Sequence, residues 1–243
     1  GEPKKLIEDV LNAGVGHNFK PAVELLVEES ERCVDQWLIE RLKIPFDRLP
    51  DGQFDFAMEA AHSQKRILHV KDATGKSIMD RLDLEIASNP SINVLNASVI
   101  DLLLTDRQDT RREKSFSVSR CVGASLFVPE TKKVVQVVAR ATLLATGGFS
   151  QLYLHSTGPI TSRGDGIAVA HRAGARTMDL EFVQFHPTSL YVQGRPRQLL
   201  TEALRGAGAR ILNDQGEVFV DALAPRDVVS RAIHEELLKS GHE

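Results

Sequence analysis

The side chains best suited to chemistry lie in apolar or glycine-rich stretches of the chain. They are Glu59, His186, Thr201, Glu202, Arg205 and Arg226. Two arginines, a histidine, a threonine and a glutamate form the set that a C4-dicarboxylate would need, because arginine binds carboxylates through charge-assisted, bidentate hydrogen bonds. Fixed cations also suit hydride transfer, because they stabilise the charge that develops on the substrate.

Taken singly, each of these residues also has an ordinary structural explanation. Thr201 could cap a short helix in which Glu202 and Arg205 form an i,i+3 ion pair. A histidine set among apolar residues, as His186 is, could be a hydrogen-bonded core residue. Glu59 and Arg226 could be solvated surface side chains. The interpretation as a binding site therefore depends on the residues being brought together by the fold.

Motifs for other chemistries are missing from the sequence. The eight histidines form no HExxH pair, and there is no GxSxG elbow and no GxxxxGK[ST] loop. We therefore predict no metal site and neither a metal hydrolase nor a P-loop enzyme. Gly14-Val15-Gly16 lacks the third glycine and the preceding strand of a dinucleotide-binding fingerprint.

Composition indicates an ordinary globular protein. The 243 residues include 30 Lys+Arg and 33 Asp+Glu, which gives a net charge of −3 and argues against nucleic acid as the main partner. No apolar run approaches the ~18 residues of a membrane span, and no secretory leader precedes the first helix. Cys33 and Cys121 form no CxxC pair, so free thiols and a cytoplasmic location are expected.

Hydrophobic periodicity predicts the elements that would position these side chains. Helical spacing covers residues 4–13, 21–42, 74–88 and 162–174, and further helices begin near Thr201 and Arg226. In the second helix, the expected buried positions are Val23, Leu26, Val27, Cys33, Trp37 and Leu38. Between residues 43 and 75 the sequence is expected to be irregular and polar.

Three β-rich runs predict an antiparallel meander. They cover residues 92–105, 116–128 and 133–146, and charged or proline-containing turns separate them. The third run is almost continuously apolar and ends at Gly147-Gly148, which is typical of a strand buried on both faces of a sheet. The composition changes again after these glycines, and we place a domain boundary near residue 178.

Five motifs in order carry a resemblance to a known family. They are Ala145-Thr-Gly-Gly148, Gly164-Asp-Gly-Ile-Ala-Val-Ala-His-Arg-Ala-Gly174, Glu181-Phe-Val-Gln-Phe-His-Pro-Thr188, Thr201-Glu-Ala-Leu-Arg-Gly206 and Ala224-Pro-Arg-Asp-Val-Val-Ser-Arg231. The set strongly resembles the succinate dehydrogenase/fumarate reductase flavoprotein family. Within it, Glu59-Ala-Ala-His-Ser-Gln-Lys-Arg-Ile-Leu-His69, followed by Asp72-Ala-Thr-Gly75, resembles the branch that oxidises L-aspartate.

The resemblance implies a fold and a cofactor. The expected fold class is α/β: a partial, Rossmann-like FAD-binding domain over residues 1–178, with a three-stranded β-meander. A smaller, incomplete α+β capping domain follows over residues 179–243. FAD is the implied cofactor, with Gly147 and Gly148 beside it and Asp165 in contact with it.

The resemblance also implies roles for the candidate side chains. His186, Thr201 and Arg226 match residues that hold the dicarboxylate, and Gln184 is expected to face the same pocket. In fumarate-reducing relatives the position of Arg226 delivers a proton to the substrate carbon. The relay leading to that position is matched by Glu202 and Arg205. Glu59 would pair with an ammonium group, which aspartate carries and succinate lacks.

The implied activity is FAD-dependent oxidation of L-aspartate to iminosuccinate, with oxygen or fumarate as acceptor and quinolinate synthase as a downstream partner in NAD biosynthesis. A fumarate reductase or succinate dehydrogenase flavoprotein is the alternative enzyme. The family's Gly-rich FAD fingerprint and its closing flavin segment fall outside this chain. We therefore expect an internal fragment, inactive alone, and a non-catalytic segment that needs a partner is the third hypothesis.

Overall fold

The computed structural model describes residues 2–59, 61–105, 119–195 and 197–241. The chain divides into two compact units. The first unit comprises Gly1–Ile92, Phe185–Leu190 and Leu199–Glu243, and the second comprises Asn93–Gln184 and Tyr191–Gln198. The predicted charged turn after residue 105 and the start of the second β-rich run lie outside the described residues. The domain boundary near residue 178 stays a prediction.

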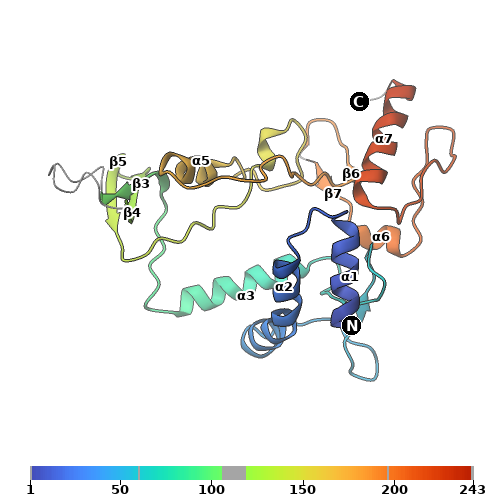
Figure 1. Ribbon diagram of the computed structural model, residues 1–243, viewed down its shortest axis with the longest axis horizontal. Coiled ribbons are helices and arrows are strands. Elements are labelled where there is room, and N and C mark those ends of the chain that lie inside the picture. Colours follow the sequence, from blue (N-terminus) through green and yellow to red (C-terminus); the bar gives the residue numbers. More distant parts are fainter. Residues whose placement is uncertain (1, 60, 106–118, 196, 242–243) are drawn as a thin grey trace. The chain divides into compact units, whose positions relative to one another are not determined.

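The N-terminal part of the first unit is helical (Figure 1). Its elements are α1 (Pro3–Ala13), α2 (Lys20–Cys33), the π-helix η1 (Val34–Arg41) and α3 (Thr74–Ser88). The helices predicted over residues 4–13 and 74–88 are confirmed. The single helix predicted over residues 21–42 is present as α2 followed by η1. α1 packs against α2.

The buried face of α2 is narrower than its sequence predicts. Val23 and Val27, one turn apart, are buried, whereas Leu26 is 63% exposed. Trp37 is 50% exposed, and the guanidinium of Arg41 lies 5.0 Å from the centre of its ring. The prediction of burial was wrong for Leu26 and Trp37. α2 buries only one narrow stripe of side chains. After Cys33 the π-helix has more residues per turn, so different positions of the sequence face the buried side.

The core of the first unit lies in a segment that was expected to be polar and irregular. Leu42, Ile44 and Phe46 are each buried, and they alternate with the exposed Lys43 and Pro45. Such alternation places every second side chain of an extended segment on one face. Partly buried side chains from η1, α3 and the two strands of the following hairpin or their flanks surround this core: Leu38, Ile39, Phe54, Leu68, Val70 and Ile78.

A short hairpin next to this core carries Glu59. β1 (Phe56–Ala57) pairs antiparallel with β2 (Ile67–Leu68). The backbone N–H of Arg66 donates to the carbonyl of Ala57 at 3.3 Å and closes the loop. We call residues 58–66 the Glu59 loop. Both ends of this loop join the hairpin, which anchors them next to the core.

The second unit contains the predicted meander. β3 (Ser98–Leu104), β4 (Cys121–Val128) and β5 (Lys133–Val138) form an antiparallel sheet in the order β3-β4-β5. The helix α5 (Asp165–Arg172) packs against β3. This part of the α/β prediction is confirmed.

The long third strand is not present in the structure. β5 ends at Val138, residues 139–149 form no strand, and Leu143 is 90% exposed. The prediction of a strand buried on both faces up to Gly147-Gly148 was therefore wrong for the described residues. A strand needs neighbouring strands to accept and donate its backbone hydrogen bonds, and no strand among the described residues pairs with residues 140–147.

The remaining elements are short, apart from the last helix. They are the 3-10 helix η3 (Ser150–Leu152), β6 (Ser189–Leu190), β7 (Gln198–Leu199), α6 (Glu202–Gly206) and α7 (Arg226–Ser240). β6 and β7 form a two-stranded sheet. Among the described residues, no helix has the length and apolar character needed to cross a lipid bilayer.

We predict that Gly123→Ala disrupts the meander. Gly123 has φ +147°, and a Cβ there would lie 2.0 Å from the carbonyl oxygen of Val137 in the neighbouring strand. The substitution should destabilise the sheet by at least about 2 kcal/mol, because backbone must shift to admit the methyl group. Amide hydrogen exchange of β4 and β5 measures the effect. Gly75→Ala in α3, where no atom lies within 4 Å, is the matched control; equal exchange in both variants would contradict the prediction.

Candidate active site

Thr201 begins the short helix that carries two of the candidate residues. Its Oγ1 accepts a hydrogen bond from the backbone N–H of Ala203 at 3.4 Å, so the predicted N-cap is confirmed. The cap fixes the first turn of α6. Glu202 and Arg205 are three positions apart in α6, so this turn places them on the same side of the helix.

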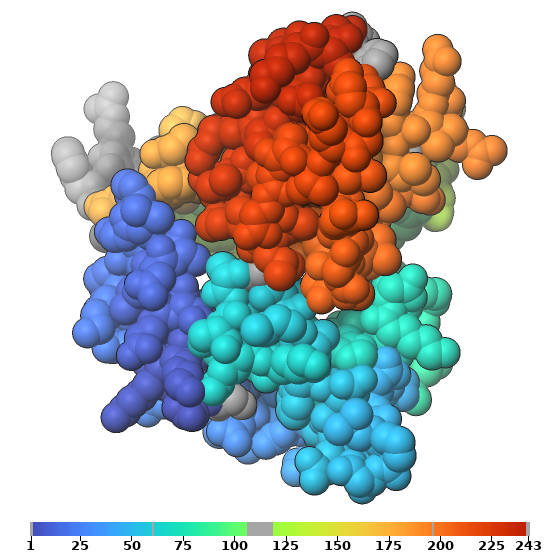
Figure 2. All heavy atoms as spheres, turned by 90° about the vertical axis from the view of Figure 1, so that its right-hand side faces the viewer, coloured from blue at the N-terminus to red at the C-terminus, as the bar shows by residue number. Residues whose placement is uncertain are grey.

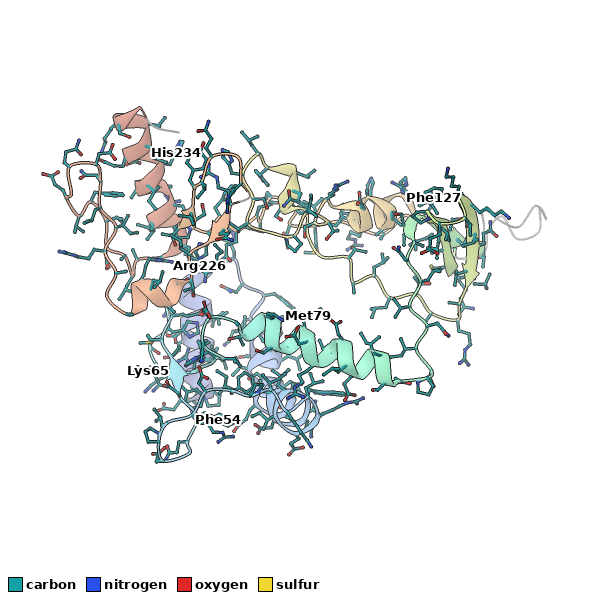
Figure 3. All side chains as sticks on the ribbon, turned by 180° about the vertical axis from the view of Figure 1, so that it is seen from behind. Phe54, Lys65, Met79, Phe127, Arg226 and His234 are labelled. Carbon is teal, nitrogen blue, oxygen red and sulfur yellow. The ribbon has the colours of Figure 1, made fainter. Side chains whose placement is uncertain are left out.

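Glu202 is shared by two arginines. Its Oε2 lies 2.7 Å from Nε and 2.6 Å from Nη2 of Arg226, the first residue of α7. The same oxygen lies 3.5 Å from Nη2 of Arg205, which confirms the i,i+3 ion pair. Figure 3 labels Arg226 at the start of α7. The structure therefore joins α6 to α7 through one carboxylate oxygen.

This cluster is buried and carries excess positive charge. The Glu202 and Arg205 side chains are 6% and 3% exposed, whereas that of Arg226 is 31% exposed. Arg205 Nη1 also donates to the carbonyl of Ala222 at 2.7 Å. Two guanidinium groups share a single carboxylate, and charges removed from water need partners. Arg226, the partly exposed member of the cluster, carries a guanidinium group, which is suited to binding a carboxylate.

His186 lies close enough to this cluster for its protonation to depend on it. Its Nδ1 is 2.9 Å from the carbonyl oxygen and 3.3 Å from the backbone nitrogen of Thr188. Burial lowers the pKa of His186, and the positive charges of Arg226 and Arg205 lower it further. At neutral pH the ring is therefore uncharged, and it contributes a hydrogen bond rather than a cation to the site.

The Glu59 loop packs against the C-terminal end of α6. A Cβ on Gly206 would lie 3.2 Å from the carbonyl oxygen of Met58, the residue before Glu59. Figure 2 shows residues of the 200–225 segment, in orange, directly against the 50–75 segment, in cyan. Gly206 thus permits the close approach of the loop. Sequence reasoning missed this role, and the glycine that ends the Thr201–Gly206 motif was its only signal.

A second group of candidates lies in the second unit. Gly147 has φ +72°, a conformation that favours glycine, and the N–H of Gly164 donates to the carbonyl of Gly148 at 3.2 Å. Gly164 precedes Asp165, the first residue of α5. These contacts join the glycine turn to the N-terminal end of a helix, where backbone N–H groups and an acid meet.

Gly166 and Thr146 complete this turn and were missed from the sequence. A Cβ on Gly166 would lie 1.9 Å from Oγ1 of Thr146. Only glycine therefore lets α5 approach the glycine turn so closely. The second glycine of Gly164-Asp165-Gly166 was the available signal, but the sequence alone cannot show what the missing side chain would meet.

The candidates are thus distributed over both units. His186, Thr201, Glu202, Arg205, Arg226 and Glu59 belong to the first unit. Gln184 belongs to the second unit together with Gly147, Gly148 and Asp165, and its expected place in the substrate pocket stays a prediction.

A pocket of about 250 Å³ also lies in the first unit. Its lining includes Thr188, Asn213, Phe219 and Glu236, but none of the candidate residues. Asn213 Nδ2 donates to Glu236 Oε1 at 3.2 Å, so part of the polar lining is already paired within the protein. In the described part of the chain, no group of three or more histidine, cysteine, aspartate or glutamate side chains could hold a metal ion.

Comparison with known proteins places these features in a family. The sequence profile described as "FAD binding domain" matches residues 1–243. The chain belongs to this FAD-binding domain family. The cofactor indicated by the match is FAD.

Curated relatives of this chain include several L-aspartate oxidases. An L-aspartate oxidase of Pseudomonas aeruginosa is 40% identical over 249 residues, which cover 97% of the chain and 45% of the relative. An L-aspartate oxidase of a Nostoc species is 38% identical over 245 residues, covering 98% of the chain and 40% of the relative. The chain therefore spans less than half the length of these relatives.

Solved structures support the family's fold. An E. coli quinol fumarate reductase chain matches with a TM-score of 0.84 at 24% identity, over 98% of this chain and 41% of that one. Sdh1 of Mycobacterium smegmatis, in complex with UQ1, matches with a TM-score of 0.76 at 30% identity, over 98% and 40%. The chain thus has the flavoprotein fold with mixed α/β content, and the predicted family is confirmed.

The glycine turn of the second unit fits part of an FAD molecule. No atom lies within 4 Å of where a Cβ on Gly148 would be, so the backbone there is accessible. The carboxylate of Asp165 can accept hydrogen bonds from hydroxyl groups, and the N-terminal end of α5 favours negative charge such as phosphate. Both kinds of group occur in FAD.

We predict that His186 makes stability depend on pH. Because its folded-state pKa lies below the ordinary value of 6.5, the unfolded chain takes up the proton first as the pH falls. The contribution is complete above about pH 6.5 and is lost on acidification below it. Denaturant unfolding between pH 5 and 8 measures this, and His186→Gln should have a flatter profile. His234→Gln on the exposed side of α7 is the control; identical profiles for both variants would contradict the prediction.

Proposed function

We propose that this chain is part of an FAD-dependent enzyme that oxidises L-aspartate to iminosuccinate. The observation that carries the proposal is the Arg205–Glu202–Arg226 cluster with the uncharged His186 beside it. The names of the curated relatives support the same activity. Residues 1–178 would form a partial FAD-binding domain and residues 179–243 an incomplete capping domain.

The substrate carboxylates would be held by residues of the first unit. Arg226 keeps Nε and Nη2 on Glu202, which fixes the plane of its guanidinium group. A fixed guanidinium plane binds a planar carboxylate more specifically than a mobile one. His186 and Thr201 would complete the carboxylate site with neutral hydrogen bonds. A role in substrate binding for Gln184, a residue of the second unit, stays a proposal from the family resemblance.

Glu59 would distinguish aspartate from succinate. Its carboxylate would pair with the substrate ammonium group, which is the one group that aspartate has and succinate lacks. The Glu59 loop contacts α6 through Met58 and Gly206, so the loop lies next to the helix that carries the cluster. This arrangement supports an amino-acid substrate.

Oxidation would remove a hydride from Cα and one proton from the ammonium group, and would leave the protonated imine of oxaloacetate, which becomes iminosuccinate on loss of a second proton to solvent. Bound FAD would supply the two-electron acceptor, which oxygen or fumarate would reoxidise. Gly147, Gly148 and Asp165 would hold the cofactor. The protein's own contribution is orientation: well-oriented reactants can gain up to ~7–11 kcal/mol of the barrier, and rigid carboxylate anchors provide part of that.

The product would be consumed by quinolinate synthase on the route to NAD, and the cytoplasm is the proposed location.

Fumarate reduction is the second candidate activity, because Arg205, Glu202 and Arg226 form a continuous series of contacts that could return a proton to the partly exposed Arg226. Proton delivery to a substrate carbon needs such a series.

We predict that Glu59→Gln impairs aspartate oxidation far more than fumarate reduction. The substitution in the complete, FAD-loaded protein removes a charge-assisted hydrogen bond to the ammonium group, worth about 1.5–3 kcal/mol. This corresponds to roughly a 10- to 150-fold loss in kcat/KM for aspartate. Steady-state kinetics with both substrates measure the change. Glu40→Gln, at an exposed position, is the control, and equal losses for both substrates would exclude the proposed role.

We predict that Arg226→Lys preserves the fold and lowers kcat by roughly 100-fold or more, because an ammonium group cannot reproduce the planar fork of arginine. Thermal unfolding and turnover with aspartate measure the two effects. Arg231→Lys, on the same helix and paired with Asp227 at the surface, is the matched control. Near-normal turnover of Arg226→Lys would mean that the arginine only stabilises the structure.

A further inference from the structure

Asp9, on α1, binds the Glu59 loop from outside the candidate site. Its Oδ2 accepts hydrogen bonds from the backbone N–H and the Oγ of Ser63, both at 2.9 Å. The same oxygen lies 2.6 Å from Nη1 of Arg66. The Asp9 and Arg66 side chains are 14% and 7% exposed, so water competes weakly for these bonds. We call Asp9, Ser63 and Arg66 the Asp9 clamp.

The clamp and the hairpin together hold the loop on three sides. The N–H of Arg66 closes the loop on Ala57, and the carbonyl of Met58 packs against Gly206. The third point of attachment is Ser63, which Asp9 binds. Between these points, the N–H of His62 donates to the carbonyl of Glu59 at 3.3 Å. Glu59 is thus separated from the clamped serine by a single turn.

The turn before Ser63 contains a strained backbone conformation, which contacts from the rest of the protein must stabilise. Ala61 has φ +62°, a left-handed conformation that residues with a side chain rarely adopt. Such conformations persist where the surrounding structure holds them in place. Two sets of side-chain contacts lie next to Ala61: Nη1 of Arg66 is 3.4 Å from Nδ1 of His62, and Asp9 accepts the hydrogen bonds of Ser63. Arg66 itself is bound by Asp9, so both sets depend on the clamp.

We propose that Asp9 is a positioning residue that sets the geometry of Glu59 and so selects substrates that carry an ammonium group. The inference rests on the proposed function. Among the described residues, the hydrogen bonds of Asp9 go to Ser63 and Arg66 and not to the Arg205–Glu202–Arg226 cluster, so its proposed effect on the site passes through the loop. The Ser63 N–H lowers the pKa of the Asp9 carboxyl, with the Arg66 guanidinium contributing, so the clamp is ionised at neutral pH.

The proposed effect is selective because the substrate anchors lie on different elements. Carboxylate binding would depend on His186, α6 and α7, and among the described residues Asp9 makes its hydrogen bonds to none of them. Releasing the loop displaces Glu59 and removes the ammonium contact. A dicarboxylate without an ammonium group loses nothing, whereas aspartate loses one of its determinants.

The experiment compares Asp9→Ala and Asp9→Asn in the complete, FAD-loaded protein. Asp9→Ala should lower kcat/KM for aspartate by roughly 10- to 100-fold, mainly through KM, because a small displacement of an orienting group is sufficient. Fumarate reduction should stay within about twofold. Asp9→Asn keeps an acceptor for Ser63 but loses the ion pair with Arg66, so its loss should be intermediate. Glu8→Ala, exposed on the same helix, is the control and should match the unmodified protein.

Amide hydrogen exchange of Ser63 and its neighbours gives a readout independent of activity. Asp9→Ala should accelerate exchange in the Glu59 loop and leave α7 unchanged. Equal losses for aspartate and fumarate, or unchanged exchange at Ser63, would overturn the inference. If the unmodified protein does not oxidise aspartate, the proposed function fails. The clamp is then judged by exchange alone, where faster exchange at Ser63 supports it.

Discussion

The first unit depends on the carboxylate of Glu202. A single oxygen binds Nε and Nη2 of Arg226 and lies within ion-pair distance of Arg205. Removing one member of a buried ion pair typically costs about 3–5 kcal/mol, because an uncompensated charge remains. The same contact fixes where α7 begins relative to α6. It therefore both stabilises the unit and orients the one arginine of the cluster that remains partly exposed.

Electrostatics around this carboxylate determine what the site can bind. The two arginines exceed the one glutamate in charge, and together with burial they keep His186 neutral by lowering its pKa. A site with a net positive charge and a neutral histidine attracts carboxylates and supplies hydrogen bonds. Selection for an ammonium group requires a separate acid, which is the reason that the placement of Glu59 is important.

Close backbone approaches complete both units. In the first unit, Gly206 admits the carbonyl of Met58, and in the second, Gly166 admits the side chain of Thr146. At both positions glycine is needed because a Cβ would occupy the space that the neighbouring group fills. The clamp at Asp9 instead relies on polar contacts. Three donors converge on one carboxylate oxygen and hold a turn that contains the strained Ala61.

The sequence by itself determined the local structure: the helices α1 and α3, the order and pairing of the meander, the Thr201 cap and the Glu202–Arg205 pair all follow from periodicity and short spacings. Motif order also identified the family. Only the tertiary structure decided that Leu26 and Trp37 are exposed, that Ile44 and Phe46 form the core, and that residues 139–149 form no strand. It alone joined Glu202 to Arg226 and Asp9 to Ser63, pairs that lie 24 and 54 positions apart. Local spacing is encoded in neighbouring residues, whereas burial and distant contacts depend on which surfaces pack together.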